Sequence, residues 1–467
     1  MKRFLLVLLS LGLVLAFSAS AMAVDVQISG EFYAAGMYLN KTTLNDSRYG
    51  YDRDNPSTAF YYQRLRVESD FIVAPGLKLV TRFDAMERIW GGARSEPGTP
   101  DSQSVGTRAE NENIAFDWAY INYDSPIGTF MVGYGPDNFW GTTFGDSISG
   151  HSTGQIAYFK PVGNFFFGAI VYKEGDNSKS AVTAGTTTTD QDADKYVLLG
   201  VYNLNKDINF GLLACYYRDA SGRNFSSWYN GVLGPNTPAY GHMSAYYLWP
   251  YFKAKFGPVA LEGELEYAWG TITSETAGNS DVNVEDLDIY LAANVNLGMF
   301  YLGGQFAYLQ GDDPGSSKRS GGITGQNGGM DWNPCLIMFN YDTINYWVGG
   351  IQGHSNSQVG GPMTNAWFFQ GKVGAHPISA LDINASISFA TADKKPDPKG
   401  YGITYGNGNY GTEVDLTGTY KITNNLSYML GFGYLFTGDY FKGYDYYGAN
   451  YKTVDDFIVI NKLTLTF

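Results

Sequence analysis

The sequence has little cysteine, histidine and charge, and each shortage excludes a class of protein. Two cysteines, Cys215 and Cys335, are too few for a disulfide scaffold, and we expect no bond between residues so far apart. There are only four histidines, and all but His376 lie in predicted long loops, so we expect no enzyme. Charged residues make up 16% of the chain, below the ~25% of ordinary soluble domains.

Long apolar runs are also missing beyond the first residues. Lys2 and Arg3 precede the apolar run 4–17, and Ala21-Met22-Ala23 fits the small-residue pattern at which signal peptides are cut. The run is shorter than the ~20 residues that cross a bilayer as a helix. We therefore expect a signal peptide at 1–23, export, and one mature domain at 24–467.

The charge balance narrows the partners further. The formal net charge of −14 argues against nucleic acid as a partner. The acidic stretches 176–195 and 311–315 lack the spacing of an EF-hand loop, so we expect no metal and no cofactor.

What the chain has in abundance is alternation with a period of two. In 381–389, LDINASISF, the odd positions carry Leu, Ile, Ala, Ile and Phe, and the even positions carry Asp, Asn and Ser. A strand puts successive side chains on opposite faces, so one face is apolar and the other polar. A soluble sandwich could contain one such strand. The same alternation recurs at 24–32, 258–269, 285–295 and 412–420, where charged side chains occupy one face and residues such as Leu, Ile and Trp the other. Full charges on one face and large apolar side chains on the other favour strands that lie between lipid and water.

The connections alternate between short turns and long polar loops, which is typical of outer-membrane barrels. Eight turns and nine loops predict eighteen strands, with 16 as the alternative because 331–350 could form a hairpin within a long loop. We therefore expect an all-β, transmembrane antiparallel barrel with an aqueous channel, its short turns in the periplasm and its loops outside. The predicted turns are 74–76, 124–128, 162–164, 205–207, 257–258, 296–298, 376–379 and 423–425.

The last strand carries the most specific resemblance. In 457–467, FIVINKLTLTF, the odd positions are apolar except Asn461, and the chain ends in Phe467. This strand resembles the closing strand of Gram-negative outer-membrane porins of the general-diffusion type. The tyrosine-rich, acidic composition resembles porins of deltaproteobacteria.

The resemblance implies a function, partners and a location. It implies passive diffusion of ions and small hydrophilic solutes through a channel in the bacterial outer membrane. It also implies a homotrimer among outer-membrane lipid and lipopolysaccharide, with Phe467 as the signal read by the barrel-assembly machinery. The third long loop, 136–154, would narrow the pore, with Asp137 and Asp146 as its acidic residues.

Charged residues on the predicted inner faces suggest how the pore would treat ions. Lys or Arg at mid-bilayer on the lipid side would cost ~2–4 kcal/mol, so these side chains are expected to face the lumen. The basic residues have two possible roles. They set up a transverse electric field against the acidic residues of the loop, or they pair with acidic residues of the wall in a network that does not select ions. The acids on two later strands, with the net charge, predict mild cation preference. The basic set is Arg64, Arg66, Lys78, Arg82 and Arg88, and the acidic set is Glu262, Glu264, Glu266, Asp286 and Asp288.

Aromatic residues near the predicted strand ends have two interpretations. They form a girdle at the membrane interfaces, or they stack on sugars inside the lumen. These residues are Tyr33, Tyr38, Tyr61, Tyr62, Trp90, Trp118, Tyr120, Tyr123, Trp249, Trp269 and Tyr434. Two functional classes compete with a porin: a surface adhesin that uses the loop 311–364, and, less favoured, a barrel enzyme.

Overall fold

The computed structural model describes the chain from residue 24 to residue 467, apart from several loop stretches. The predicted signal peptide at 1–23 and Asp146 lie outside the described residues. The stretches that are not described are 45–54, 92–113, 138, 146–151, 177–189, 222–240, 276–279, 314–315, 323–328, 353–357, 396–406 and 445–449.

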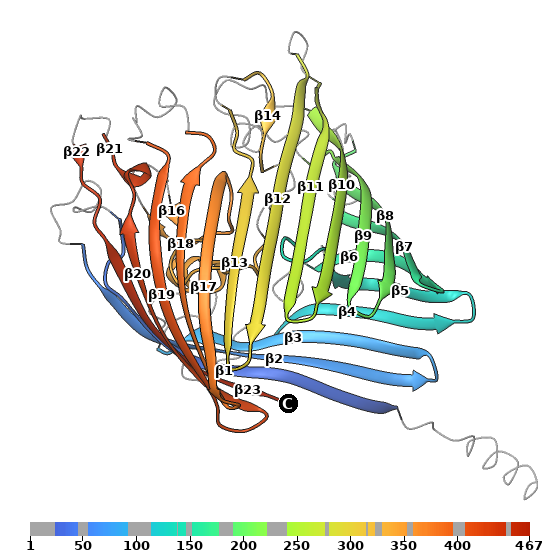
Figure 1. Cartoon of the computed structure of the whole chain (residues 1–467). Helices are drawn as coiled ribbons and strands as arrows, with labels where there is room; N and C mark the ends of the chain where they lie inside the picture. Colours follow the sequence, from blue (N-terminus) through green and yellow to red (C-terminus); the bar gives the residue numbers. More distant parts are fainter. Residues whose placement is uncertain are drawn as a thin grey trace, which may run out of the picture.

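Eighteen antiparallel strands pair in chain order into a closed ring, as the spacing of turns predicts (Figure 1). Each strand pairs with the strands before and after it, and the last pairs with the first. The strands are β1 (Asp25–Leu39), β2 (Thr58–Ala74), β3 (Leu77–Ile89), β4 (Ile114–Ser125), β5 (Gly128–Pro136), β6 (Ser152–Val162), β7 (Phe165–Asp176), β8 (Asp192–Asn205), β9 (Ile208–Asp219), β10 (Gly241–Phe256), β11 (Val259–Ser274), β12 (Val282–Leu297), β13 (Phe300–Leu309), β17 (Ala366–Ile378), β18 (Leu381–Ala392), β19 (Asn409–Lys421), β20 (Leu426–Thr437) and β23 (Asp456–Thr466).

The ring closes where the two ends of the described chain meet. Gly30 and Phe467 exchange both backbone hydrogen bonds, at 2.9 and 3.0 Å. A side chain at position 30 would collide with the Phe467 ring, so the glycine leaves the room that this ring occupies. In Figure 1 the first strand, in blue, lies beside β23, in red.

The short turns lie at one end of the ring, called here the turn end, and the long loops lie at the other, the loop end. Tight turns need residues that tolerate a positive φ, and Gly257 and Gly298 adopt φ of 59° and 67° there. The eight predicted turns all connect consecutive wall strands.

The outer surface of the ring is apolar. Alternate residues of the wall strands place large apolar side chains there, and in several strands, among them β2, β3 and β4, the alternation is interrupted by bulges. Leu198 is 65% exposed between the buried Val197 and the half-buried Leu199, for example. An outer face of this kind suits a hydrocarbon surrounding, because exposed apolar patches of this extent are rare in water-soluble monomers.

The inner face is not uniformly polar, and this differs from the prediction. Ile458 and Ile460 face inward on β23 with 0% and 3% exposure, although alternation predicts a polar inner face. They are covered by residues of the segment between β13 and β17, which folds back inside the ring. An apolar inner face is stable there because chain, not water, lies against it.

The segment between β13 and β17 contains short elements rather than the hairpin considered for 331–350. Residues 341–348 form helical turns instead. Among the described residues, no helix is long and apolar enough to cross a membrane. The elements outside the ring's wall are β14 (Arg319–Ser320), η1 (Tyr341–Asn345), α3 (Tyr346–Val348), β15 (Ile351–Gln352), β16 (Gln358–Val359), η3 (Asp439–Phe441), β21 (Gly443–Tyr444) and β22 (Asn450–Tyr451).

The aromatic residues divide between the two faces of the wall. Tyr38, Tyr61, Trp90, Tyr123, Trp269 and Tyr434 lie on the outer face, where the first five are 37–55% exposed. The others face inward, and three of them, Tyr33, Tyr62 and Trp249, are at most 7% exposed. The girdle interpretation therefore fits the first group only.

Candidate functional site

A network of ion pairs covers the inner face of β2, β3 and β4. Arg66 and Asp84 sit opposite one another across β2 and β3, and both guanidinium contacts to the carboxylate measure 2.7 Å. Such a bidentate pair fixes both side chains in one geometry. Lys78 binds Asp70 at 2.6 Å nearer the turn end.

Arg82 joins this network from β3. Its Nε lies 3.0 Å from an Asp117 oxygen, and its guanidinium stacks 3.5 Å from the centroid of the Trp118 ring. A cation held over an indole face and against a carboxylate gains from both contacts. Arg82 is only 4% exposed, so it lies within the wall layer rather than extending into open space.

The other two predicted basic residues lie closer to the loop end. Arg64 reaches Glu87 at 3.8 Å and Glu31 at 3.9 Å. Arg88 is 8% exposed, beyond the bulge at Met86, whose φ is 52°. Arg64, Arg66, Lys78 and Arg82 therefore each have a carboxylate within ion-pair distance.

The loop after β5 runs along the inner wall, and its first anchor is a buried lysine. Lys195 of β8 binds Asp137 at 2.7 Å and Glu174 at 2.6 Å. Asp137 is 3% exposed, so it fixes the start of the loop rather than presenting a bare charge.

A single carboxylate on β11 then anchors the described part of this loop. Glu264 accepts the backbone N–H groups of Thr142, Thr143 and Phe144 at 2.9, 2.7 and 2.6 Å. The indole N–H of Trp249 donates to the same carboxylate at 3.0 Å. Gly141, with φ of 82°, permits this approach, since any side chain there would strike Glu264. The described part of the loop thus follows the inner wall from β8 to β11.

The remaining predicted acids also face inward, and most are buried. Glu266 and Asp288 are opposite one another across β11 and β12, with 6% and 1% exposure. Asp288 accepts the backbone N–H of Gln310 at 3.0 Å, and Asp286 is 2% exposed. Glu262, nearer the turn end, is half-buried. The acids of these two strands thus lie largely beneath other chain segments.

A second segment, between β13 and β17, also folds into the ring, and its position inside the ring was not predicted. Glu413 of β19 accepts the backbone N–H groups of Ile337 and Met338, both at 2.7 Å. Leu336 fills the room left by Gly431 and Gly433 on the inner face of β20. The alternation of large outward and glycine inward residues at 430–433 was the available signal.

This second segment reaches both the opposite wall and the first loop. Trp347 packs on Tyr62 of β2 with ring centroids 4.6 Å apart, and Trp332 meets Phe144 of the first loop at 6.0 Å. Two inserted segments, each held by one buried glutamate, therefore meet inside the barrel and narrow it.

Cys215 and Cys335 are both buried free thiols. Cys335 is buried in the second inserted segment at 3% exposure. Burial raises the pKa of the Cys335 thiol well above its ordinary value, so the thiol stays protonated.

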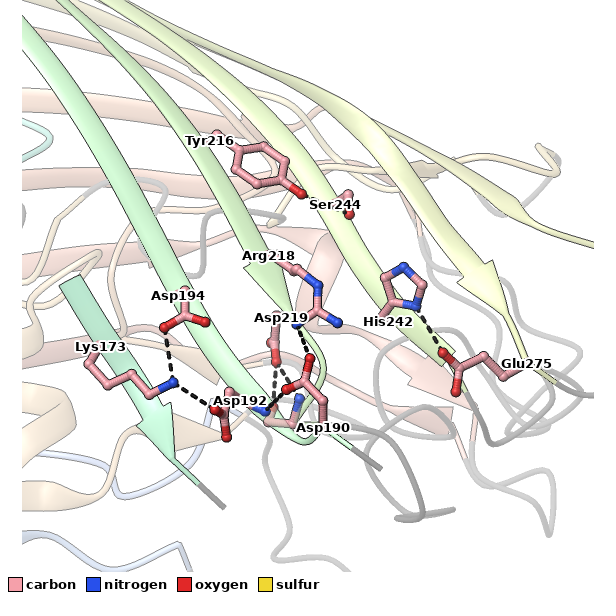
Figure 2. Close-up of polar contacts among 11 residues, drawn as sticks. Lys173, Asp190, Asp192, Asp194, Tyr216, Arg218, Asp219, His242, Ser244 and Glu275 are labelled. Atoms are coloured by element: carbon pink, nitrogen blue, oxygen red, sulfur yellow. Dashed lines mark hydrogen bonds and ion pairs between the residues drawn. The ribbon is translucent and has the colours of Figure 1, made fainter. Parts of the chain in front are cut away.

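Charged side chains also lie at the loop end of β7 to β11, on the outer face (Figure 2). Lys173 binds Asp192 and Asp194 at 2.8 and 3.0 Å, and Arg218 binds Asp190 at 2.7 Å. Below them Tyr196, Tyr216, Tyr246 and Trp269 follow one another on the outer face, with ring centroids 5.1–6.2 Å apart. Charge above an aromatic row is the arrangement found at a membrane interface.

Comparisons with known proteins give similarity of architecture only. No family model matches the chain, and no curated protein matches it. A BenF-like porin from Pseudomonas fluorescens Pf-5 is 10% identical, with 94% of this chain and 99% of that chain covered and a TM-score of 0.48. The anion-selective porin from Comamonas acidovorans is 11% identical over 95% and 99%, with a TM-score of 0.43. The trimer form of OmpT, an outer-membrane protein of Vibrio cholerae, is 11% identical over 95% and 100%, with a TM-score of 0.43.

Proposed function

We propose that this chain is a porin of the bacterial outer membrane, through which ions and small hydrophilic solutes diffuse passively. One observation carries the proposal: a closed ring of strands has an apolar outer face and holds its charged network inside. A hydrocarbon surrounding leaves no other stable place for that network, because each exposed charge would cost several kcal/mol at mid-bilayer.

The two inserted segments support a restricted channel rather than a wide one. Both are tied to the wall by hydrogen bonds from consecutive backbone N–H groups to one carboxylate. Phe139, in the first of these segments, is 68% exposed, which indicates accessible space beside the loop inside the ring. A fixed narrowing beside accessible space is what size-dependent diffusion requires.

The surroundings of the barrel are part of the same proposal. A cleaved signal peptide at 1–23 would export the chain, and Phe467 would serve the barrel-assembly machinery. The aromatic row on the outer face would mark the interface with outer-membrane lipid and lipopolysaccharide. We propose a homotrimer as the working assembly.

Ion preference is the finer part of the proposal. Acidic residues outnumber basic ones, 45 to 31, which supports mild cation preference. The acids Glu264 and Asp137 are engaged in anchoring the first loop, so the preference would rest on the remaining charges.

Planar-bilayer recording tests the proposal. Purified refolded protein should give stepwise conductance increments, and a salt gradient should give a reversal potential with the sign of cation preference. Stepwise conductance with the opposite sign would overturn the ion preference alone. Refolded barrels that give no steps would overturn the porin.

A further inference from the structure

The outer face of β6 to β10 carries an open apolar groove that diffusion through the channel does not use. Its floor lies over Ala169 of β7 and Ala214 of β9, whose side chains are small. Leu198 of β8 stands opposite both alanines in the register and is 65% exposed between them. Ile156 and Val171, 61% and 46% exposed, belong to its apolar lining. The groove measures 580 Å³, within the ~300–1,000 Å³ of ligand sites, so it can hold part of an extended apolar molecule.

From this groove toward the loop end, the outer face changes from apolar to hydroxyl-bearing and then to charged. In the next row of outward residues, Tyr196 and Tyr216 are opposite one another across β8 and β9. In the row after that, Asp194 stands opposite both Lys173 and Arg218. Outward residues of one strand follow one another at about 6–7 Å, so the charged row lies about 13 Å from the floor of the groove.

The charged row holds more carboxylates than cations. Lys173 binds Asp192 and Asp194 at 2.8 and 3.0 Å, and Arg218 binds Asp190 at 2.7 Å (Figure 2). In the described part of the chain, these contacts join three carboxylates to two cations, which leaves one negative charge in excess. An ammonium group is therefore attracted to this row, whereas an anionic headgroup would have to compete with carboxylates for both cations.

A second outer groove, on β10 to β18, has a similar shape without the excess charge. It is larger, at 850 Å³, and lies over Gly304 and Gly371. Toward its loop end, Trp367 donates to Asp393 at 3.2 Å, and Asp393 pairs with Lys394 at 3.8 Å, so these two charges balance. An apolar groove is thus common to both places, and the negative charge beyond it distinguishes the first.

We propose that the first groove and its charged row bind one phosphatidylethanolamine molecule from the surrounding membrane; this rests on the function proposed above. An acyl chain would lie over Ala169 and Ala214, where small side chains permit close van der Waals contact. The phosphate would accept a hydrogen bond from the Tyr196 hydroxyl, and the terminal ammonium would donate to Asp194. The order of acyl chain, phosphate and ammonium in this lipid matches the order of the three rows.

The test measures which lipid stays bound to the purified refolded protein. The protein in detergent is mixed with equal amounts of phosphatidylethanolamine and phosphatidylglycerol that have identical acyl chains, and retained lipid is counted by native mass spectrometry. Phosphatidylglycerol has no ammonium group and a net negative charge. Protein with one lipid should carry phosphatidylethanolamine in at least about threefold excess, the effect of one exposed ion pair. Equal amounts, or an excess of phosphatidylglycerol, would overturn the proposal.

Two further results of the same measurement would assign the groove to another occupant. Displacement of phosphatidylethanolamine by an equal amount of lipopolysaccharide would assign it to lipopolysaccharide. Retention of lipid by monomers but not by oligomers would show that a second copy of the chain covers the groove. Either result would overturn the proposal.

Variants separate the contribution of charge from that of shape. Asp194→Asn leaves two carboxylates for two cations and should bring the ratio of the two lipids close to one. Ala169→Phe fills the groove and should remove the retained lipid. Gly371→Phe is the matched control for shape, because a side chain there meets open space in the second groove. Asp312→Asn is the control for charge, since Asp312 pairs with Arg319 beyond β13. Both controls should keep the wild-type ratio.

Conductance distinguishes this proposal from the function on which it rests. The substitutions in the groove and the charged row lie on the outer face, so each variant should conduct ions as the wild-type protein does. Protein that conducts ions but retains both lipids equally contradicts only the lipid site. Refolded protein that gives no conductance contradicts the porin itself.

Discussion

The inner faces of β2–β4 and of the pair β20 and β23 come from the same kind of alternating sequence but carry opposite chemistry. On β2–β4 the inward side chains are Arg, Lys, Asp and Glu, paired with one another across the strands. On β20 and β23 the inward positions are Gly431, Gly433, Ile458 and Ile460, which lie against Leu336 of the second inserted segment. The difference teaches that the outer face of a barrel strand is set by the surrounding lipid. The inner face depends on whether water or another part of the chain lies against it.

The largest effect is expected when the Glu413 carboxylate, which holds the second inserted segment on the wall, is removed. Glu413 is 0% exposed, and Glu413→Ala leaves the N–H groups of Ile337 and Met338 buried without a partner. We expect the free energy of unfolding to fall by about 2–5 kcal/mol. The single-channel conductance should rise as the segment detaches. Thermal unfolding on gels and bilayer recording measure the two effects.

The control for Glu413 is Glu285→Gln, since Glu285 binds Lys318 at the exposed loop end. It should leave both stability and conductance close to the wild-type values. Unchanged conductance in Glu413→Ala, in a folded barrel, would mean that the second segment does not narrow the channel.

The ion pairs on the inner face of β2, β3 and β4 should respond to mutation as a coupled unit. Asp84→Ala leaves Arg66 facing a site without its bidentate partner, while the double variant with Arg66→Ala removes both charges. A double-mutant cycle should give a coupling energy of about 1–3 kcal/mol in the free energy of unfolding. A coupling energy near zero would show that water screens this pair, and the wall network would then contribute nothing to rigidity.

A pair of glycine variants isolates how the first loop docks on the wall. Gly141 and Gly163 both adopt positive φ, but only a side chain at 141 would meet Glu264, whereas position 163 opens onto free space. Alanine at either site costs backbone strain of about 1–2 kcal/mol. Only Gly141→Ala should also raise the conductance. Equal conductance in the two variants would contradict docking of the loop on Glu264.

The smallest effect on stability is expected at the exposed end of the ion-pair network on β2, β3 and β4. The Lys78 side chain is 37% exposed where it binds Asp70, so solvent screens the pair. Asp70→Asn should lower the free energy of unfolding by less than ~1 kcal/mol. A larger loss of unfolding free energy, measured with urea, would show that the rigid part of the ion-pair network reaches the turn end.

The sequence predicted the ring itself well. Period-two alternation and short turns gave the eighteen strands, since lipid acts on every outward residue in the same way. Asn461, the polar exception on the outer face, donates to the backbone oxygen of Gly36 at 3.3 Å, so its amide is satisfied within the wall. Local pattern was sufficient here because neighbouring strands are also neighbours in the chain.

The interior could be predicted only in part. The described part of the third long loop lies along the inner wall, but its anchor Glu264 is far along the chain, and no spacing rule connects Glu264 to Thr142 or Phe144. The second inserted segment was missed because its contacts with Glu413 and Tyr62 join distant parts of the sequence. The pattern predicts that the acids line the pore, whereas Glu264 anchors the first loop.

The central claim is that one face of each strand meets hydrocarbon and the other meets water or chain inside a closed ring. Spin labels at single cysteines on β19, in a background without Cys215 and Cys335, test it directly in proteoliposomes. Labels at Leu416 and Tyr420, both exposed on the outer face, should collide with oxygen dissolved in the lipid. Labels at Thr417 and Thr419 should instead collide with a water-soluble nickel complex. The same accessibility at all four positions, or the reverse pattern, would contradict the barrel's placement in a membrane.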